Sequence, residues 1–149
     1  AKLARAPTLA ELAVEPLVSY ESSTRADSSL RQAFTAEGLQ ARFAMTARDA
    51  DLIKTYVRAG LGVGVLAEMA VDAREDSDLV ALPAPSLPEC IAWAVLPRER
   101  VLRDYALELL KTLAPQLDRR DLRRVLEGNA EADWPAPPAW AELGRAVSV

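Results

Sequence analysis

The sequence predicts an α/β fold in which a parallel sheet with flanking helices forms one lobe. Short apolar segments typical of buried strands lie at 17–20, 42–46 and 63–67, and amphipathic helical patterns separate them. The last two segments enclose one helix. Two buried strands joined by a helix of this length form a right-handed crossover, so a parallel sheet is expected.

The first elements have clear boundary signals. Thr8 and Glu11 are spaced as a capping box, which predicts a short helix over 9–13 that ends before a proline. A strand follows at 17–20, and a polar loop at 21–26 leads into the next helix. These signals predict the order helix, strand, loop.

The second helix is expected to begin at Asp27. Gly38 closes it, because a residue without Cβ adopts the left-handed conformation at a helix end without steric cost. The apolar positions of this helix form one stripe: Leu30, Ala33 and Phe34.

The unit 42–67 carries the most consistent signals in the chain. A buried strand is expected to end at Thr46, Asp49 to cap a helix, and Gly60 to stop it. The apolar face of this helix is formed by Leu52, Ile53, Tyr56 and Val57. The opposite, solvent-facing side is expected to carry Arg48, Asp51, Lys54, Thr55 and Arg58.

The remainder of the chain is less regular. We expect a solvated loop rich in charge around 72–78, short strands at 79–82 and 90–96, and a buried Cys90 in the second of them. A strongly amphipathic helix is expected from 101 to 113, with seven apolar residues on one face: Val101, Leu102, Tyr105, Ala106, Leu109, Leu110 and Leu113.

A further helix is expected to begin at Asp118 and end at Gly128, and an extended tail with prolines and tryptophans follows. The expected divisions are an α/β lobe at 1–97, C-terminal helices at 98–128 and the tail at 129–149.

Composition restricts the function. The 149 residues include no histidine and one cysteine, which removes Ser-His and Cys-His nucleophile pairs and the common imidazole metal sites. We therefore expect no enzyme, no catalytic residue, no metal and no cofactor. The net charge of −4 is the wrong sign for a surface that grips DNA.

Half of the residues are apolar, but no apolar run approaches the roughly 20 residues of a membrane span. No membrane partner is expected, and the single cysteine is compatible with a reducing cytoplasm. A first residue other than methionine suggests an excised part of a longer protein.

Three glycines, Gly60, Gly62 and Gly64, superficially suggest a dinucleotide-binding loop. Such a loop must follow a strand and open a helix so that the helix amides point at the phosphate. Here the glycines follow a helix and lead into a strand. The order favours a helix stop and close packing of a buried strand.

Hydroxyl groups follow two strands of the expected sheet. Ser22, Ser23 and Thr24 follow the first strand, and Thr46 ends the second. Ligands of open α/β sheets collect at the carboxyl ends of strands, so these residues are candidates for binding an anionic or amide-bearing small molecule. The alternative is that the loop hydroxyls cap the next helix. Acidic residues at 49 and 51 oppose an anion there.

The run 44–64 resembles the effector-binding region of LysR-type transcriptional regulators, and most closely the CysB-like group, which controls sulfur assimilation and cysteine synthesis. Its sequence is AMTARDADLIKTYVRAGLGVG. The resemblance extends upstream through LAVEPLVSY at 12–20 and downstream through AEMAVD at 67–72 and DLVAL at 78–82. A weaker match covers 98–105 and the helix after it.

The resemblance implies one half of a type II periplasmic-binding-protein-like effector domain, comprising the second subdomain and the C-terminal segment. It implies a sulfate- or acetylserine-like effector, with Thr46 in its site, a homo-oligomer, and DNA binding only through a domain absent from this chain. The loop departs from the family's Phe-Thr-Gly-Arg-like segment, because 24–27 reads Thr-Arg-Ala-Asp with the arginine displaced. A lobe of a solute-binding protein is the alternative.

The resemblance also bears on association. In such regulators the C-terminal strand and helix pack on the first subdomain, which this chain lacks. We therefore expect the helix at 101–113 either to form a dimer through its apolar face, which we favour, or to fold back on the chain's own sheet with the helix at 118–127 as a lid.

Overall fold

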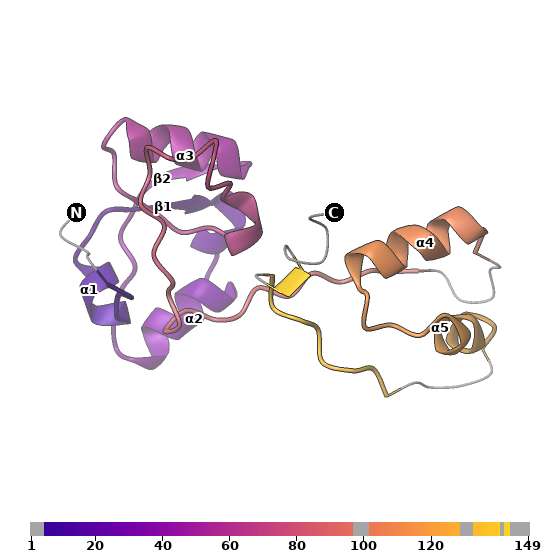
Figure 1. Cartoon of the computed structure of the whole chain (residues 1–149). Coiled ribbons are helices and arrows are strands. Elements are labelled where there is room, and N and C mark those ends of the chain that lie inside the picture. The colour runs from indigo at the N-terminus through magenta and orange to yellow at the C-terminus, as the bar shows by residue number, and fades with distance from the viewer. Residues whose placement is uncertain (1–4, 97–101, 129–132, 141, 144–149) are drawn as a thin grey trace. The chain divides into compact units, whose positions relative to one another are not determined.

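A computed structural model describes residues 5–96, 102–128, 133–140 and 142–143 (Figure 1). The chain divides into two compact units, Ala1–Cys90 and Ile91–Val149. The first unit contains the sheet, and the second contains the two C-terminal helices.

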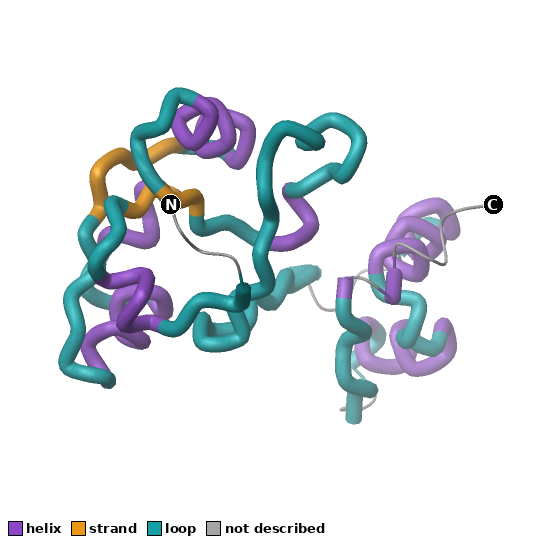
Figure 2. The backbone as a smooth tube through the Cα atoms, turned by 60° about the vertical axis from the view of Figure 1, so that its left-hand side comes forward, coloured by secondary structure: helices purple, strands orange, loops and turns teal. Residues whose placement is uncertain are grey.

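The first unit is built on a parallel sheet of three strands, β1 (Leu17–Tyr20), β2 (Phe43–Ala47) and β3 (Val63–Gly64), in the order β2-β1-β3 (Figure 2). Both pairings are parallel, and β1 is the central strand. The prediction of a parallel α/β lobe is confirmed.

Helices cover both faces of this sheet. On one face α1 (Leu9–Ala13) and α2 (Ser29–Ala36) pack against β1. On the other face α3 (Ala50–Arg58) packs against the same strand. The side chains at the centre of the two cores have no exposed surface: Leu17 and Phe34 in the first, and Val18 and Ile53 in the second.

Most boundary signals are confirmed. Thr8 and Glu11 form the capping box of α1, and Asp49 Oδ1 accepts from Leu52 N at 2.8 Å at the start of α3. Gly38 and Gly60 adopt φ values of 68° and 75° after α2 and α3. The start of α2 differs from the expectation, because Ser28 rather than Asp27 caps it.

Three strand predictions need correction. The middle of β2 is exposed rather than buried, since β2 is an edge strand. No ladder forms at 79–82 or 90–96, and β3 is followed by a short 3₁₀ helix, η2 (Glu68–Ala70). Cys90 is exposed, not buried. The segment 90–96 is entirely apolar, but an apolar segment forms a strand only beside a partner strand.

The second unit contains α4 (Asp104–Leu113) and α5 (Arg119–Leu126), and Asp118 caps α5 as expected. Its buried apolar residues are Leu107, Leu110, Leu122 and Leu126. Ion pairs Arg119–Glu108 and Arg123–Asp104 join α5 to α4, the second at 3.2 Å.

The predicted face of α4 was therefore partly wrong. Leu107, which was not assigned to it, is fully buried, whereas Tyr105, Leu109 and Leu113 are 71%, 59% and 63% exposed. Val101 lies outside the described residues. In the tail, Trp134 and Trp140 are 40% and 43% exposed.

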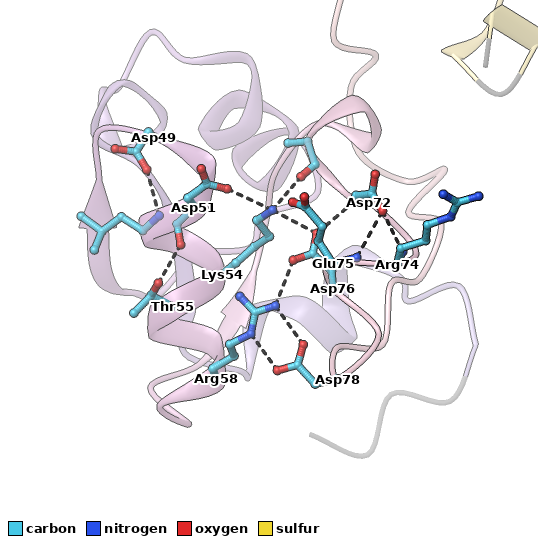
Figure 3. Close-up of polar contacts among 12 residues, drawn as sticks. Asp49, Asp51, Lys54, Thr55, Arg58, Asp72, Arg74, Glu75, Asp76 and Asp78 are labelled. Atoms are coloured by element: carbon cyan, nitrogen blue, oxygen red, sulfur yellow. Dashed lines mark hydrogen bonds and ion pairs between the residues drawn. The ribbon is translucent and has the colours of Figure 1, made fainter. Parts of the chain in front are cut away.

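A cluster of charged side chains attaches the loop that follows η2 to the helix α3 (Figure 3). Lys54, expected on the solvent side, is buried, and its Nζ lies 3.0 Å from Asp76 Oδ2 and 3.1 Å from Ala70 O. Arg58 donates to Asp76 Oδ1 at 2.9 Å and also pairs with Asp78. The loop was predicted to be solvated, but Asp76 is buried because two cations and the Asp72 N–H satisfy its oxygens.

These contacts shift the acidity of the cluster. The Asp72 N–H, and after it Lys54, lower the pKa of Asp76 to about 2. Hydrogen bonds to Asp76 and Asp51 raise the pKa of Lys54. Both shifts favour the charged forms, so the cluster stabilises the folded protein at neutral pH.

Acid should weaken the ion pairs that Asp76 forms with Lys54 and Arg58. The pKa of Asp76 is depressed in the folded protein, so its stabilising contribution is present above its unfolded pKa, about 3.9, and is lost as the pH falls toward about 2. Urea unfolding of the wild type should therefore show a falling free energy of unfolding across that window, and Asp76→Asn should flatten this dependence. Glu75→Gln, an exposed neighbour, is the control. If the free energy of unfolding of Asp76→Asn fell equally steeply with falling pH, the stabilising role of Asp76 would be contradicted.

Close packing at Gly62 should be intolerant of a side chain. A Cβ at this position would lie 2.2 Å from the Pro16 carbonyl oxygen, which accepts the hydrogen bond of Val63 N. Overpacking of this kind costs about 1–3 kcal/mol, so Gly62→Ala should lower the free energy of unfolding by at least that amount. Leu61→Ala, at a partly exposed neighbour, should change it by less than about 0.5 kcal/mol in the same denaturant titration.

Candidate functional site

The candidate residues meet at one edge of the sheet. The segment η1 (Glu21–Thr24) follows β1 directly and contacts the ends of β1 and β2. Thr46 is the Cα partner of Ser19 near the carboxyl ends of these strands. The structure therefore brings the η1 hydroxyls and Thr46 to the same edge, as the sequence predicted, and the Thr46 side chain is exposed there.

Ser22 and Ser23 line an open hollow of about 310 Å³ at this edge. The rest of its lining comes from the following loop and the start of α2: Arg25, Asp27, Ser28, Ser29 and Leu30. Thr24 and Thr46 do not line it. The hollow is thus formed by the loop and the start of α2, and Thr46 lies outside its lining on the edge strand β2.

The hydroxyl groups of the loop have different hydrogen-bonding roles. Thr24 Oγ1 donates to Glu21 O at 2.8 Å, so its proton is used within η1. Ser28 Oγ donates to Ser23 O at 2.8 Å and accepts from Arg31 N at 3.2 Å. The cap of α2 is therefore Ser28, and the Ser22 and Ser23 hydroxyls are not used for capping.

Arg25 and Asp27 bring opposite charges to the hollow. The guanidinium is bidentate to the carboxylate, with Nε–Oδ1 at 2.9 Å and a second bond at 3.1 Å. This hydrogen bonding raises the pKa of Arg25 and lowers that of Asp27. The displaced arginine is consequently neutralised by its own neighbour.

Ser19, which the sequence did not single out, lies beneath the hollow and contacts Ser23, one of the residues that line it. Its side chain is 1% exposed, and its Oγ lies 3.2 Å from Ser23 Oγ and 3.0 Å from Val65 O. The available signal was a serine within the apolar strand LVSY. A buried hydroxyl requires hydrogen-bond partners, and these connect the loop to the chain just after β3.

A second hollow, of about 580 Å³, lies over the charge cluster of Lys54, Arg58 and Asp76. Its two cations, Lys54 and Arg58, pair with aspartates of the same lining, so they serve the fold (Figure 3). The described part of the chain contains no group of His, Cys, Asp or Glu suited to a metal ion. Its helices are too short or too polar to span a membrane.

The three glycines have the structural role that their order favoured. Gly62 closely approaches the Pro16 carbonyl, and a Cβ on Gly64 would lie 2.9 Å from Val57 Cγ2. Both glycines allow β3 to pack against its neighbours. They lie away from the hollow, which contains neither.

Comparisons with known proteins agree with the fold. The chain is 40% identical over 120 residues to the HTH-type transcriptional regulator SsuR of Burkholderia cenocepacia, covering 80% of this chain and 39% of that protein. It is 36% identical to CysB of the same organism, covering 84% and 40% of the two chains. It is 33% identical to cbl of Escherichia coli K12, covering 83% and 40%. The chain thus spans about two fifths of the length of these relatives.

A solved structure is also similar. The cofactor-binding domain of the Cbl transcriptional regulator superposes with a TM-score of 0.65 at 30% identity, covering 80% of this chain and 53% of that chain. Residues 1–118 match the LysR substrate binding domain. The resemblance inferred from 44–64 is therefore confirmed, and the chain belongs to the LysR substrate-binding domain family.

Proposed function

We propose that this chain is the effector-sensing part of a LysR-type transcriptional regulator of sulfur or cysteine metabolism. The observation that carries the proposal is the match of 1–118 to the family, together with relatives named SsuR, CysB and cbl. The regulator acts in the cytoplasm, where its DNA lies, and it is not an enzyme. DNA is bound by a domain outside this chain.

The effector is a small anionic or amino-acid-derived molecule, sulfate- or acetylserine-like. Thr46, Ser22 and Ser23 form one side of its cleft, and Thr24 shapes the loop through its bond to Glu21 O. The support is the shared strand edge, the open hollow and the hydroxyls that α2 does not use. The opposite side of the cleft comes from the other subdomain of the regulator.

The alternative function, one lobe of a solute-binding protein, has the same architecture. The names of the relatives favour a regulator. The coding sequence upstream of Ala1 distinguishes the two: a winged helix-turn-helix supports the regulator, and an export signal would overturn it.

Thr46 should contribute directly to effector affinity. In the complete regulator, Thr46→Val keeps the side-chain volume but removes the hydroxyl. A hydrogen bond to a charged group is worth roughly 1.5–3 kcal/mol, so calorimetry should show effector binding weakened by about tenfold or more. Thr35→Val on α2, whose Oγ1 donates to Arg31 O, is the control. An unchanged dissociation constant for Thr46→Val would reject this site.

Association should depend on the exposed stripe of α4. Tyr105, Leu109 and Leu113 repeat every four residues, and burying a large aliphatic side chain is worth about 1.5–3 kcal/mol. We expect the chain to sediment as a dimer at equilibrium and a variant with both Leu109→Glu and Leu113→Glu to be a folded monomer. Leu110 is left unchanged, because it is buried and a charge there would disrupt folding.

Lys111→Glu, at an exposed residue of α4 that lies away from the stripe, is the control and should remain dimeric. Monomeric wild-type protein would contradict association through this stripe and favour the alternative, in which α4 folds back on the sheet of the same chain.

A further inference from the structure

Ser19 is unusual among the buried residues of the sheet. Buried parallel strands are typically built from aliphatic side chains, and Leu17 and Val18 follow that rule with no exposed surface. Ser19 places a hydroxyl in this environment, 1% exposed, between the η1 loop and the end of β3. Val65 N donates to Val18 O at 2.8 Å, and Val65 O faces the Ser19 hydroxyl.

Ser19 Oγ makes two contacts, one with Val65 O and one with Ser23 Oγ, and counting hydrogens shows which group donates in the second. A serine hydroxyl has one hydrogen, and a carbonyl oxygen can only accept. Ser19 therefore gives its hydrogen to Val65 O, 3.0 Å away. The remaining contact, 3.2 Å between Ser19 Oγ and Ser23 Oγ, then requires the hydrogen of Ser23. Ser23 Oγ is left with lone pairs only.

We propose that Ser19 is a specificity-determining residue of the effector site, because it makes Ser23 present an acceptor rather than a donor to the hollow. This inference rests on the proposed function of the hollow. It predicts preference for an effector group that donates hydrogen bonds, such as an ammonium. Sulfate offers only acceptor oxygens at neutral pH and gains nothing from Ser23.

The surroundings of Ser23 support this polarity. Ser28 uses its hydrogen on Ser23 O, so it offers no donor to the hollow, and the Asp27 carboxylate is itself an acceptor. Arg25 faces Asp27. Arg25 uses two of its five N–H groups on Asp27, so the donors left to the lining are its other N–H groups, the hydroxyls of Ser22 and Ser29, and the backbone amides that begin α2.

The test uses two probes on the complete regulator, sulfate and O-acetyl-L-serine, with dissociation constants from calorimetry. The readout is the ratio of the two constants, because general destabilisation by a variant weakens both probes together. Ser19→Ala frees the Ser23 hydrogen, so the ratio should shift toward sulfate by roughly three- to tenfold. Ser19→Thr keeps the hydroxyl, suits a strand, and should retain the wild-type ratio.

A double-mutant cycle assigns the effect to Ser23. In a Ser23→Ala background, Ser19→Ala should change the ratio by less than about twofold. A ratio that is unchanged in folded Ser19→Ala, or that shifts equally in both backgrounds, would overturn the assignment of Ser19 while the site stands. No binding of either probe to the wild type, or no effect of Ser23→Ala and Thr46→Val, would overturn the proposed site and this assignment together.

Discussion

Burial of β1 is the constraint on which the first unit depends. Leu17 and Val18 point to opposite faces of the sheet and are both fully buried, one in the core with α1 and α2 and the other in the core with α3. A strand buried on both faces must have its backbone groups paired on both edges, since water cannot satisfy them. β2 and β3 supply these partners, and glycine at 62 lets the chain entering β3 approach Pro16 closely enough to pair.

The sequence predicted those parts of the fold that depend on local chemistry. The capping box at Thr8, the cap at Asp49 and the glycine stops at 38 and 60 act within a few residues, so their outcome is visible in the sequence. The strand predicted at 90–96 failed for the opposite reason. Its seven residues are all apolar, with Trp93 82% exposed, but a ladder requires a partner that no local pattern specifies.

The candidate site was predictable in place but not in detail. Strand ends of a parallel sheet share one edge, and this topology was enough to place Ser22, Ser23 and Thr46 at the same edge, although only the two serines line the hollow. The assignment of individual protons was not predictable, because it depends on contacts between segments distant in sequence, such as Ser19 with Val65. The same limit applies to Lys54, which the helical pattern placed in solvent and which Asp76, 22 residues away, holds in the interior.

The two polar hollows of this unit differ in how their cations are paired, and this difference limits the kind of ligand that the proposed site can bind. Over α3 the cations Lys54 and Arg58 are satisfied by Asp76 and Asp78, and their task is to fix the loop after β3. At the strand edge, Arg25 is the one cation among the described residues that line the hollow, and its guanidinium pairs with Asp27. In the proposed site, an anionic group gains hydrogen bonds from hydroxyls, amides and the remaining N–H groups of Arg25, but the charge of that guanidinium is already paired with Asp27. The proposed function therefore requires that the Arg25–Asp27 pair opens on binding or that the other subdomain of the proposed regulator supplies the charge. In both cases the proposed site gains selectivity from hydrogen-bond direction more than from net attraction.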